Sequence, residues 1–223
     1  MATLTIVERP IREQQLPRSD LDRLLQSDAT LFPNSLTLGT LQSWYDANAT
    51  NFLAYDIPDG QSSEETLGTL VAYPMKAKPW AQLINGELEE HAITSDMILP
   101  LSMSAWSSDD YDLGYGVHVW HIEKAEGWNK ATRKSFKEVF WSSLQRSADG
   151  LASKGMNCIG FSALCASTEG VRAFSNLGFR LQRYCDSVFQ NRAGECKIMD
   201  STTADDEWKL LFKCAMYVKG NRD

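Results

Sequence analysis

The second half of the chain alternates between strand-like and helix-like segments, and this alternation is the feature that most limits its fold. Residues 115–124 are rich in β-branched and aromatic side chains, which are typical of strands. A helical pattern follows at 135–153, then an apolar strand at 157–162, a short helix at 168–176 and a strand at 179–190. A helix that joins two strands in this way is a crossover connection, and crossovers connect parallel strands. The pattern therefore predicts a sheet that is at least partly parallel.

The rest of the chain has the spacing of an antiparallel meander with short helices. Helices are expected near residues 19–25, 36–48 and 79–93, the last with a turn at Asn85-Gly86. Strands are expected at 4–8, where Pro10 ends the strand, and at 51–56, 66–73 and 208–218; polar loops are expected at 58–65 and 200–207. The expected class is therefore mixed α+β, with residues 1–223 forming one domain.

Composition narrows the class of protein further. The chain has 223 residues and a net charge of −7, which argues against a broad nucleic-acid groove, because such grooves need clustered Lys and Arg. No stretch approaches the roughly 18 apolar residues of a membrane span, and the first residues do not look like a secretory signal. The five cysteines form no CxxC pair. We therefore expect a cytoplasmic protein with reduced thiols and no bound metal.

Residues 163–179, ALCASTEGVRAFSNLGF, give the most specific signal in the chain. A strand end, a short helix and a Leu-Gly-Phe turn in this order resemble the GNAT acyltransferase superfamily. The resemblance implies a central mixed sheet of about six to seven strands, splayed in the middle and flanked by helices. It also implies acetyl-CoA, or another acyl-CoA, as cosubstrate. Its pantetheine arm would lie between strands 116–124 and 157–162 and use their unpaired backbone groups.

The expected phosphate loop departs from the family pattern. Residues 123–136 contain a single glycine, Gly127, although glycines normally let backbone amides approach phosphates. Five basic residues and one acidic residue lie between Lys124 and Lys137, and these cations could hold phosphate instead. They could equally be surface charges with no ligand. The cofactor contacts expected here are Ile122 and Lys124 for pantetheine and Gly127, Trp128, Asn129, Lys130, Arg133 and Lys134 for the phosphates.

Three more cofactor contacts follow from the resemblance, namely Ser162, Ser167 and Phe174. The register of the Leu-Gly-Phe turn puts Ser167 where the family often has a cofactor-binding Asn. It puts Phe174 where the family often has a Tyr that protonates the departing thiolate. Because Phe carries no such proton, water or another group would have to supply it.

The strand at 115–124 carries the candidates for a general base. Transfer to an amine needs a base, because an ammonium group is not a nucleophile. His118 is our first candidate, Glu123 the second, and His121 lies between them. On a regular strand, His118 and His121 would face opposite sides, whereas His121 and Glu123 would share one. Both histidines could instead be packed, hydrogen-bonded residues of a half-buried sheet.

The resemblance places the segment from Trp80 to His91 where the family often builds its acceptor site, and the segment contains Glu87, Glu89 and Glu90. Acidic side chains there would suit a cationic amine, although a solvated helix face is the commoner explanation.

The function predicted from the sequence is an acyl-CoA-dependent N-acyltransferase, with acetyl-CoA the expected donor and a small-molecule amine the expected acceptor. The amine would attack the thioester directly. The alternative is a catalytically silent GNAT-fold protein that binds a ligand or partner. Neither nucleic acid nor a membrane is expected as a partner, and a homodimer is left open.

Overall fold

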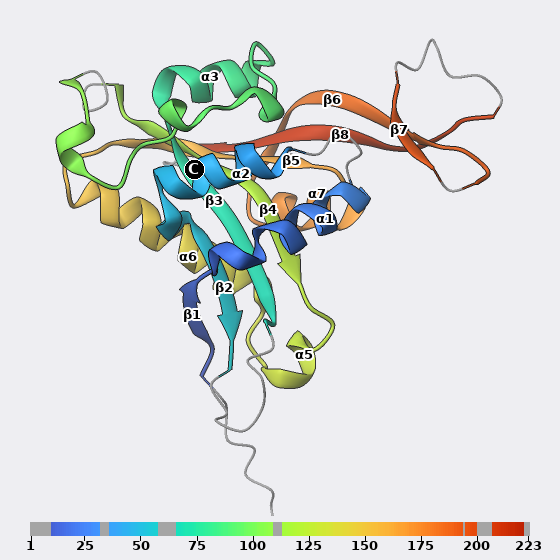
Figure 1. Ribbon diagram of the computed structural model, residues 1–223, viewed down its shortest axis with the longest axis horizontal. Helices are drawn as coiled ribbons and strands as arrows, with labels where there is room; N and C mark the ends of the chain where they lie inside the picture. The colour runs from blue at the N-terminus through green and yellow to red at the C-terminus, as the bar shows by residue number, and fades with distance from the viewer. Residues whose placement is uncertain are drawn as a thin grey trace, which may run out of the picture.

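One mixed sheet organises the molecule, seen in a computed structural model that describes residues 10–31, 36–57, 66–108, 113–193, 195–199 and 207–220 (Figure 1). Within these residues the sheet has eight strands in the order β1-β2-β3-β4-β5-β8-β6-β7. They are β1 Arg12–Gln15, β2 Phe52–Asp56, β3 Gly68–Lys76, β4 Tyr115–Lys124, β5 Cys158–Cys165, β6 Arg180–Gln190, β7 Cys196–Ile198 and β8 Lys209–Gly220. The expected strand at 4–8, the loop at 58–65 and most of the loop at 200–207 lie outside the described residues.

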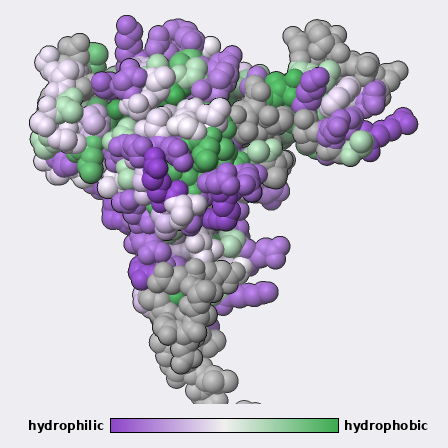
Figure 2. All heavy atoms as spheres, viewed as in Figure 1, coloured by the Kyte–Doolittle hydropathy of each residue, from purple (hydrophilic) through white to green (hydrophobic). Residues whose placement is uncertain are grey.

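The parallel pairing is confined to β4 and β5, and the other neighbouring strands pair antiparallel. The first crossover predicted from the sequence is thus confirmed. The second joins β5 to β6, but these strands do not pair, because β8 lies between them and pairs with both. Beyond the body of the molecule, β6 and β8 continue as a long ribbon (Figure 1). Hydrophilic side chains cover much of the face in this view (Figure 2).

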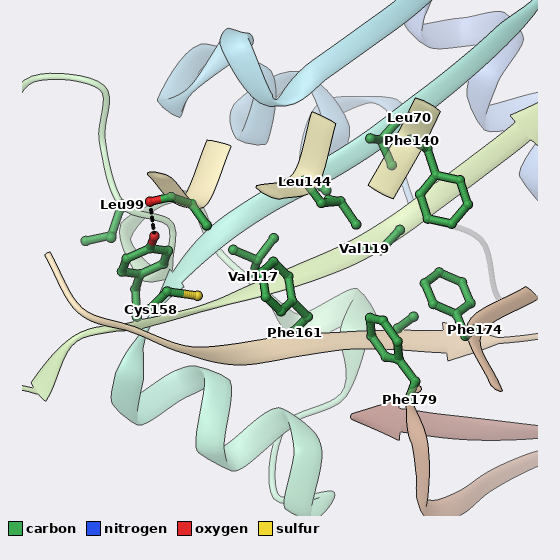
Figure 3. Packing of buried hydrophobic residues seen from close by; sticks show 14 of the residues in the cluster. Leu70, Leu99, Val117, Val119, Phe140, Leu144, Cys158, Phe161, Phe174 and Phe179 are labelled. Carbon is green, nitrogen blue, oxygen red and sulfur yellow. Dashed lines mark hydrogen bonds between the residues drawn. The ribbon is translucent and has the colours of Figure 1, made fainter. Parts of the chain in front are cut away.

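Helices cover both faces of the sheet. They are α1 Leu21–Leu31, α2 Leu38–Ala47, α3 Ala77–Asn85, α5 Trp128–Ala131, α6 Phe136–Ala152 and α7 Thr168–Ser175. One core cluster contains side chains of α6 and α7, including Phe140 and Phe174, which lie close together with Phe179 (Figure 3). The other cluster lies under α1, α2 and α3 and includes Leu24, Trp44 and Trp80. Two separate apolar faces explain why all these helices are amphipathic.

The edge strand β1 has no counterpart in the sequence prediction. Its residues, REQQ, are polar and lack the apolar alternation by which strands are found. Two hydrogen bonds, of 2.9 and 2.6 Å, connect the Arg12 guanidinium to the buried carboxylate of Asp56, and Gln14 donates a third at 2.8 Å. Charge-assisted pairing with β2 therefore holds this strand.

A bulge in β4 corrects the expected orientation of the histidines. The register with β3 skips Trp120, so the strand contains one extra residue at this point. His118 therefore lies opposite Tyr73 and His121 opposite Val71, and both partners belong to the cluster under α1 and α2. His118 and His121 face the same side of the sheet, not opposite sides, because the bulge shifts the alternation. Glu123 shares that side with His121, as expected.

Candidate functional site

The strands β4 and β5 separate before they end, and a cavity occupies the gap. Their pairing runs from Tyr115 opposite Cys158 to Val119 opposite Ala163. The backbone beyond these residues has no partner across the gap, although β4 continues to Lys124. A cavity of about 610 Å³ lies there, which we call the larger cavity. Its lining includes Trp120, His121, Ile122, Lys124, Asn129, Ser135, Phe136, Lys137, Phe140, Leu164, Cys165, Ala166, Ser167 and Phe174.

The lining of the larger cavity combines aromatic side chains with two lysines and two carboxylates, those of Asp28 and Glu169. Phe140 of α6 and Phe174 of α7 form part of its apolar wall. Lys124, at the end of β4, and Lys137, in the first turn of α6, supply cations near the N-terminus of that helix. Exposed helix N–H groups and cations together attract anions. The two lysines therefore offer a place for an anionic group of a ligand that also packs against the apolar wall.

Five of the cofactor residues predicted from the sequence line this cavity, namely Ile122, Lys124, Asn129, Ser167 and Phe174. The Ser167 hydroxyl also caps α7 by accepting a hydrogen bond from the backbone N–H of Gly170. Phe174 is 3% exposed and stacks edge-on against Phe179 at 5.0 Å.

The other predicted cofactor residues lie elsewhere. The structure places Gly127, Trp128, Lys130, Arg133, Lys134 and Ser162 outside the lining of the larger cavity. Trp128 is fully buried because α5 turns its indole into the core, where it stacks on Phe136 and donates a hydrogen bond to the carbonyl of Lys134. Lys130, Arg133 and Lys134 are exposed. Lys137, which the sequence interpretation counted only as part of the basic stretch, takes the place in the cavity expected for them.

A smaller cavity of about 240 Å³ adjoins the larger one. Its lining includes Asp28, Leu83, Glu89, Glu90, His91, Trp120, Leu164, Arg183, Cys185, Asp186 and Met216. Asp28, Trp120 and Leu164 line both cavities, so these residues mark where the two meet. Four of the lining residues are acidic, and Arg183 directs its guanidinium to the backbone carbonyls of Leu83 and Ile84. The smaller cavity is thus suited to a cationic ligand.

Glu90 begins a chain of buried hydrogen bonds behind the smaller cavity. It lies in the short 3-10 helix η3 Glu90–Ala92, and its carboxylate is 2.6 Å from Nε2 of His118. The His118 Nδ1 atom is 2.9 Å from the hydroxyl of Ser162, and Nε1 of Trp80 donates to the same hydroxyl at 2.9 Å. Burial raises the pKa of Glu90, although the hydrogen bond from His118 opposes this.

The structure places His118, our first candidate for the base, away from both cavities. Its side chain is 0% exposed and lines neither cavity. A group that takes a proton from a bound amine must come within hydrogen-bonding distance of it. Glu90, whose side chain is 13% exposed and lines the smaller cavity, meets this condition, whereas His118 does not.

His121 and Glu123 form a second pair of ionisable side chains, and they directly follow the bulge at Trp120 in β4. Nδ1 of His121 is 3.5 Å from Asp28, and its Nε2 is 3.8 Å from Glu123. Burial lowers the pKa of His121, but the two carboxylates outweigh this and raise it overall. The interaction with His121 lowers the pKa of Glu123 to about 2. Glu123 is therefore a weak base, and it lines neither cavity.

Sequence reasoning gave Asp28, Arg183, Cys185 and Asp186 no role in the site. They come from α1 and β6, which are far from β4 in sequence, and no local motif identifies them.

In the described part of the chain, no three His, Cys, Asp or Glu side chains are grouped as metal ligands would be. None of the helices described there is long and apolar enough to cross a membrane.

No family model and no curated protein matches this sequence, but solved structures match its fold. The structure of Arabidopsis thaliana NAA60 in complex with acetyl-CoA is 14% identical, with a TM-score of 0.55, and the match covers 96% of this chain and 100% of that one. The structure of Chaetomium thermophilum Naa20 in complex with a bisubstrate analogue is 12% identical in sequence, with a TM-score of 0.51. That match covers 95% of this chain and 86% of the other. The structure of an agmatine N-acetyltransferase mutant is 11% identical in sequence, with a TM-score of 0.51, and the match covers 95% of this chain and 100% of the other.

These matches extend over nearly the whole chain, and the gap between β4 and β5 agrees with the resemblance seen in residues 163–179. The chain has the fold of the GNAT N-acetyltransferases.

Proposed function

We propose that this protein transfers an acyl group from acetyl-CoA, or a related acyl-CoA, to a small cationic amine. The observation that carries the proposal is that the two cavities meet at Trp120 and Leu164, where β4 and β5 separate. The larger cavity would hold the pantetheine arm against the unpaired backbone of Ile122, with the phosphates near Lys124 and Lys137. NAA60 was crystallised with acetyl-CoA, which supports this choice of ligand.

In the proposed reaction, the amine binds in the smaller cavity among carboxylates and gives one proton to Glu90. Its nitrogen then forms a bond to the thioester carbonyl carbon, the carbon–sulfur bond breaks, and the second proton that the nitrogen must lose to become an amide passes to water. Burial raises the pKa of Glu90, which brings it closer to the range in which a carboxylate is an effective base. An agmatine N-acetyltransferase has the same fold, which agrees with a cationic acceptor.

His121 is the group that we assign to protonate the departing thiolate. It lines the larger cavity next to Trp120, and its raised pKa favours the imidazolium form, which can donate a proton. Phe174 lines the same cavity but has no proton to donate. His121 would therefore take the place of the missing tyrosine hydroxyl.

The test combines binding with turnover. Acetyl-CoA should raise the melting temperature of the purified protein by mass action, and dephospho-CoA should raise it less. Release of free thiol should then require an amine, and agmatine and other small cationic amines should be better acceptors than neutral ones. Binding of acetyl-CoA without thiol release from any amine would favour the catalytically silent alternative. No binding at all would contradict both. A cytoplasmic location and the oligomeric state stay predictions.

A further inference from the structure

We propose that Trp80 and Ser162 fix the tautomer of His118, so that its Nε2–H donates permanently to Glu90. The three residues are then positioning residues that act through Glu90 without touching the amine. The importance of Glu90 rests on the proposed function, whereas the tautomer itself does not. The inference follows from the four members of the buried chain and their donor and acceptor groups.

The two ends of the chain determine the direction of every hydrogen bond in it. The indole Nε1–H of Trp80 can only donate, so the Ser162 oxygen accepts from it at 2.9 Å. The single hydroxyl proton of Ser162 is then free to point to Nδ1 of His118, also at 2.9 Å. An ionised carboxylate can only accept, so at 2.6 Å the proton between His118 and Glu90 belongs to Nε2. Both ends therefore require the same tautomer.

The other protonation states of His118 each lose a contact. With the proton on Nδ1, the bare Nε2 lone pair would face the Glu90 carboxylate at 2.6 Å. With both nitrogens protonated, Nδ1–H would point to Ser162, and the serine hydroxyl proton would have no acceptor in this chain. Ser162 and His118 are both 0% exposed, so water does not replace what is lost. The tautomer with its proton on Nε2 is therefore the arrangement that satisfies every contact of the buried chain.

Other groups that act on Glu90 are present in both the wild type and the test variants. Four of them are neutral at physiological pH because burial raises their pKa: Tyr73, Cys165, Cys185 and Cys214. The charged or ionisable groups that line the smaller cavity with Glu90 are Asp28, Glu89, His91, Arg183 and Asp186. Since these groups do not change, a difference between variants reports on the hydrogen bonds that connect Trp80, Ser162, His118 and Glu90.

The tautomer is measured directly by 15N NMR of the imidazoles, and a His118→Gln variant assigns the signal among the three histidines. In the wild type we expect a pyrrole-like Nε2 and a pyridine-like Nδ1 across pH 6–8. Ser162→Ala should give a mixture of tautomers. Trp80→Phe should also give a mixture of tautomers. The indole ring of Trp80 packs against Gly116 and Gly160 as well, so Ser162→Ala, which changes the packing less, is the main variant.

Ser143→Ala is the matched control, because Ser143 is also a buried, hydrogen-bonded serine but contacts Tyr55 in the other core cluster. It should leave the His118 signal unchanged. A wild-type His118 with its proton on Nδ1 instead of Nε2 would overturn the proposal. An unchanged tautomer population in Ser162→Ala would overturn it as well.

Activity separates this inference from the proposed function. In a working enzyme, Ser162→Ala should move the acid limb of the kcat/KM profile upward by about one pH unit, because Glu90 loses a fixed donor. If the NMR signals behave as expected but no amine releases thiol, the proposed function fails and the tautomer assignment stands.

Discussion

His118 and His121 lie three residues apart on one face of one strand, yet their surroundings give them opposite properties. His118 belongs to the paired part of β4, and both of its ring nitrogens have close partners, at 2.6 and 2.9 Å. His121 lies where β4 has separated from β5, and its nearest partners are carboxylates at 3.5 and 3.8 Å. Partners on both nitrogens fix the hydrogen bonds of the first ring, whereas two nearby carboxylates raise the pKa of the second ring.

The difference teaches that the gap in the sheet, more than the residue type, decides which group can meet a substrate. A histidine in the paired region can act only through Glu90. A histidine at the gap lines the larger cavity directly. The predictions below test this division, from the largest expected effect to the smallest.

Glu90→Gln should have the largest effect on turnover. The amide keeps the shape of the side chain but cannot take a proton, and loss of a general base costs roughly 10²-fold or more in kcat. Affinity for acetyl-CoA should change little, because Glu90 does not line the larger cavity. Steady-state thiol release and calorimetry with CoA measure the two quantities.

Glu89→Gln is the control, since Glu89 lines the same cavity but its carboxylate lies 3.3 Å from Nε2 of His91 and has no part in the chain from Trp80 to Glu90. It should raise the KM for a cationic amine and leave kcat nearly unchanged. Full activity of Glu90→Gln would remove the base assignment and leave Asp28 as the remaining carboxylate at the boundary between the cavities.

Lys124→Ala combined with Lys137→Ala should weaken CoA binding by about tenfold, because one or two charge-assisted contacts are worth about 1.5–3 kcal/mol each before screening by salt. Lys130→Ala combined with Lys134→Ala removes the same charge from exposed positions outside the cavity. We expect that pair to bind CoA like the wild type. Calorimetry at two salt concentrations measures both, and equal loss in the two pairs would show that only the overall charge matters.

The same region shows what could be read from the sequence and what could not. The order of most strands and helices follows from local patterns, and the gap between β4 and β5 is implied by the resemblance of residues 163–179 to the GNAT superfamily. The bulge at Trp120 does not, because it arises from the pairing of β4 with β3. The partnership of Glu90 with His118 joins residues 28 positions apart, and the contact of His121 with Asp28 joins residues 93 apart. Tertiary packing alone creates such pairs.

Glu123→Gln tests the charged pair at the gap through stability. The pKa of Glu123 lies at about 2 in the folded protein, below its usual value, so its ionised form stabilises the fold above about pH 4.5. That contribution is lost as the pH falls toward 2. The raised pKa of His121 means that the pair also weakens as the pH rises through it. Since Glu123 is 36% exposed, we expect a loss of only about 1 kcal/mol in the variant.

Urea unfolding of both proteins between pH 2 and pH 9 measures this difference. It should be largest near pH 5–6 and should vanish at the acid end. A difference that stays constant over the whole range would mean that packing, not charge, connects Glu123 to His121.

Phe174→Tyr alone should have the smallest effect on turnover. Combined with His121→Gln, it tests which group protonates the thiolate. Phe174 is 3% exposed and packs against Phe140 and Phe179, but it also lines the larger cavity. If the new hydroxyl points into the cavity, it supplies a second proton donor for the thiolate, and stability should stay within about 1 kcal/mol of the wild type. Turnover should then hold or rise slightly.

The double variant with His121→Gln decides between the two orientations. His121→Gln alone should lower kcat by about tenfold, which is less than the roughly 10²–10⁴-fold typical of a general acid, because a thiolate is already a good leaving group. If the Tyr hydroxyl takes over proton donation, Phe174→Tyr should restore much of that loss, and the two changes should not be additive. If the hydroxyl instead faces the core, the variant should unfold about 1–3 kcal/mol more easily and restore nothing. In that case the register drawn from the Leu-Gly-Phe turn places residue 174 in the core, and the thiolate must take its proton from His121 or from water.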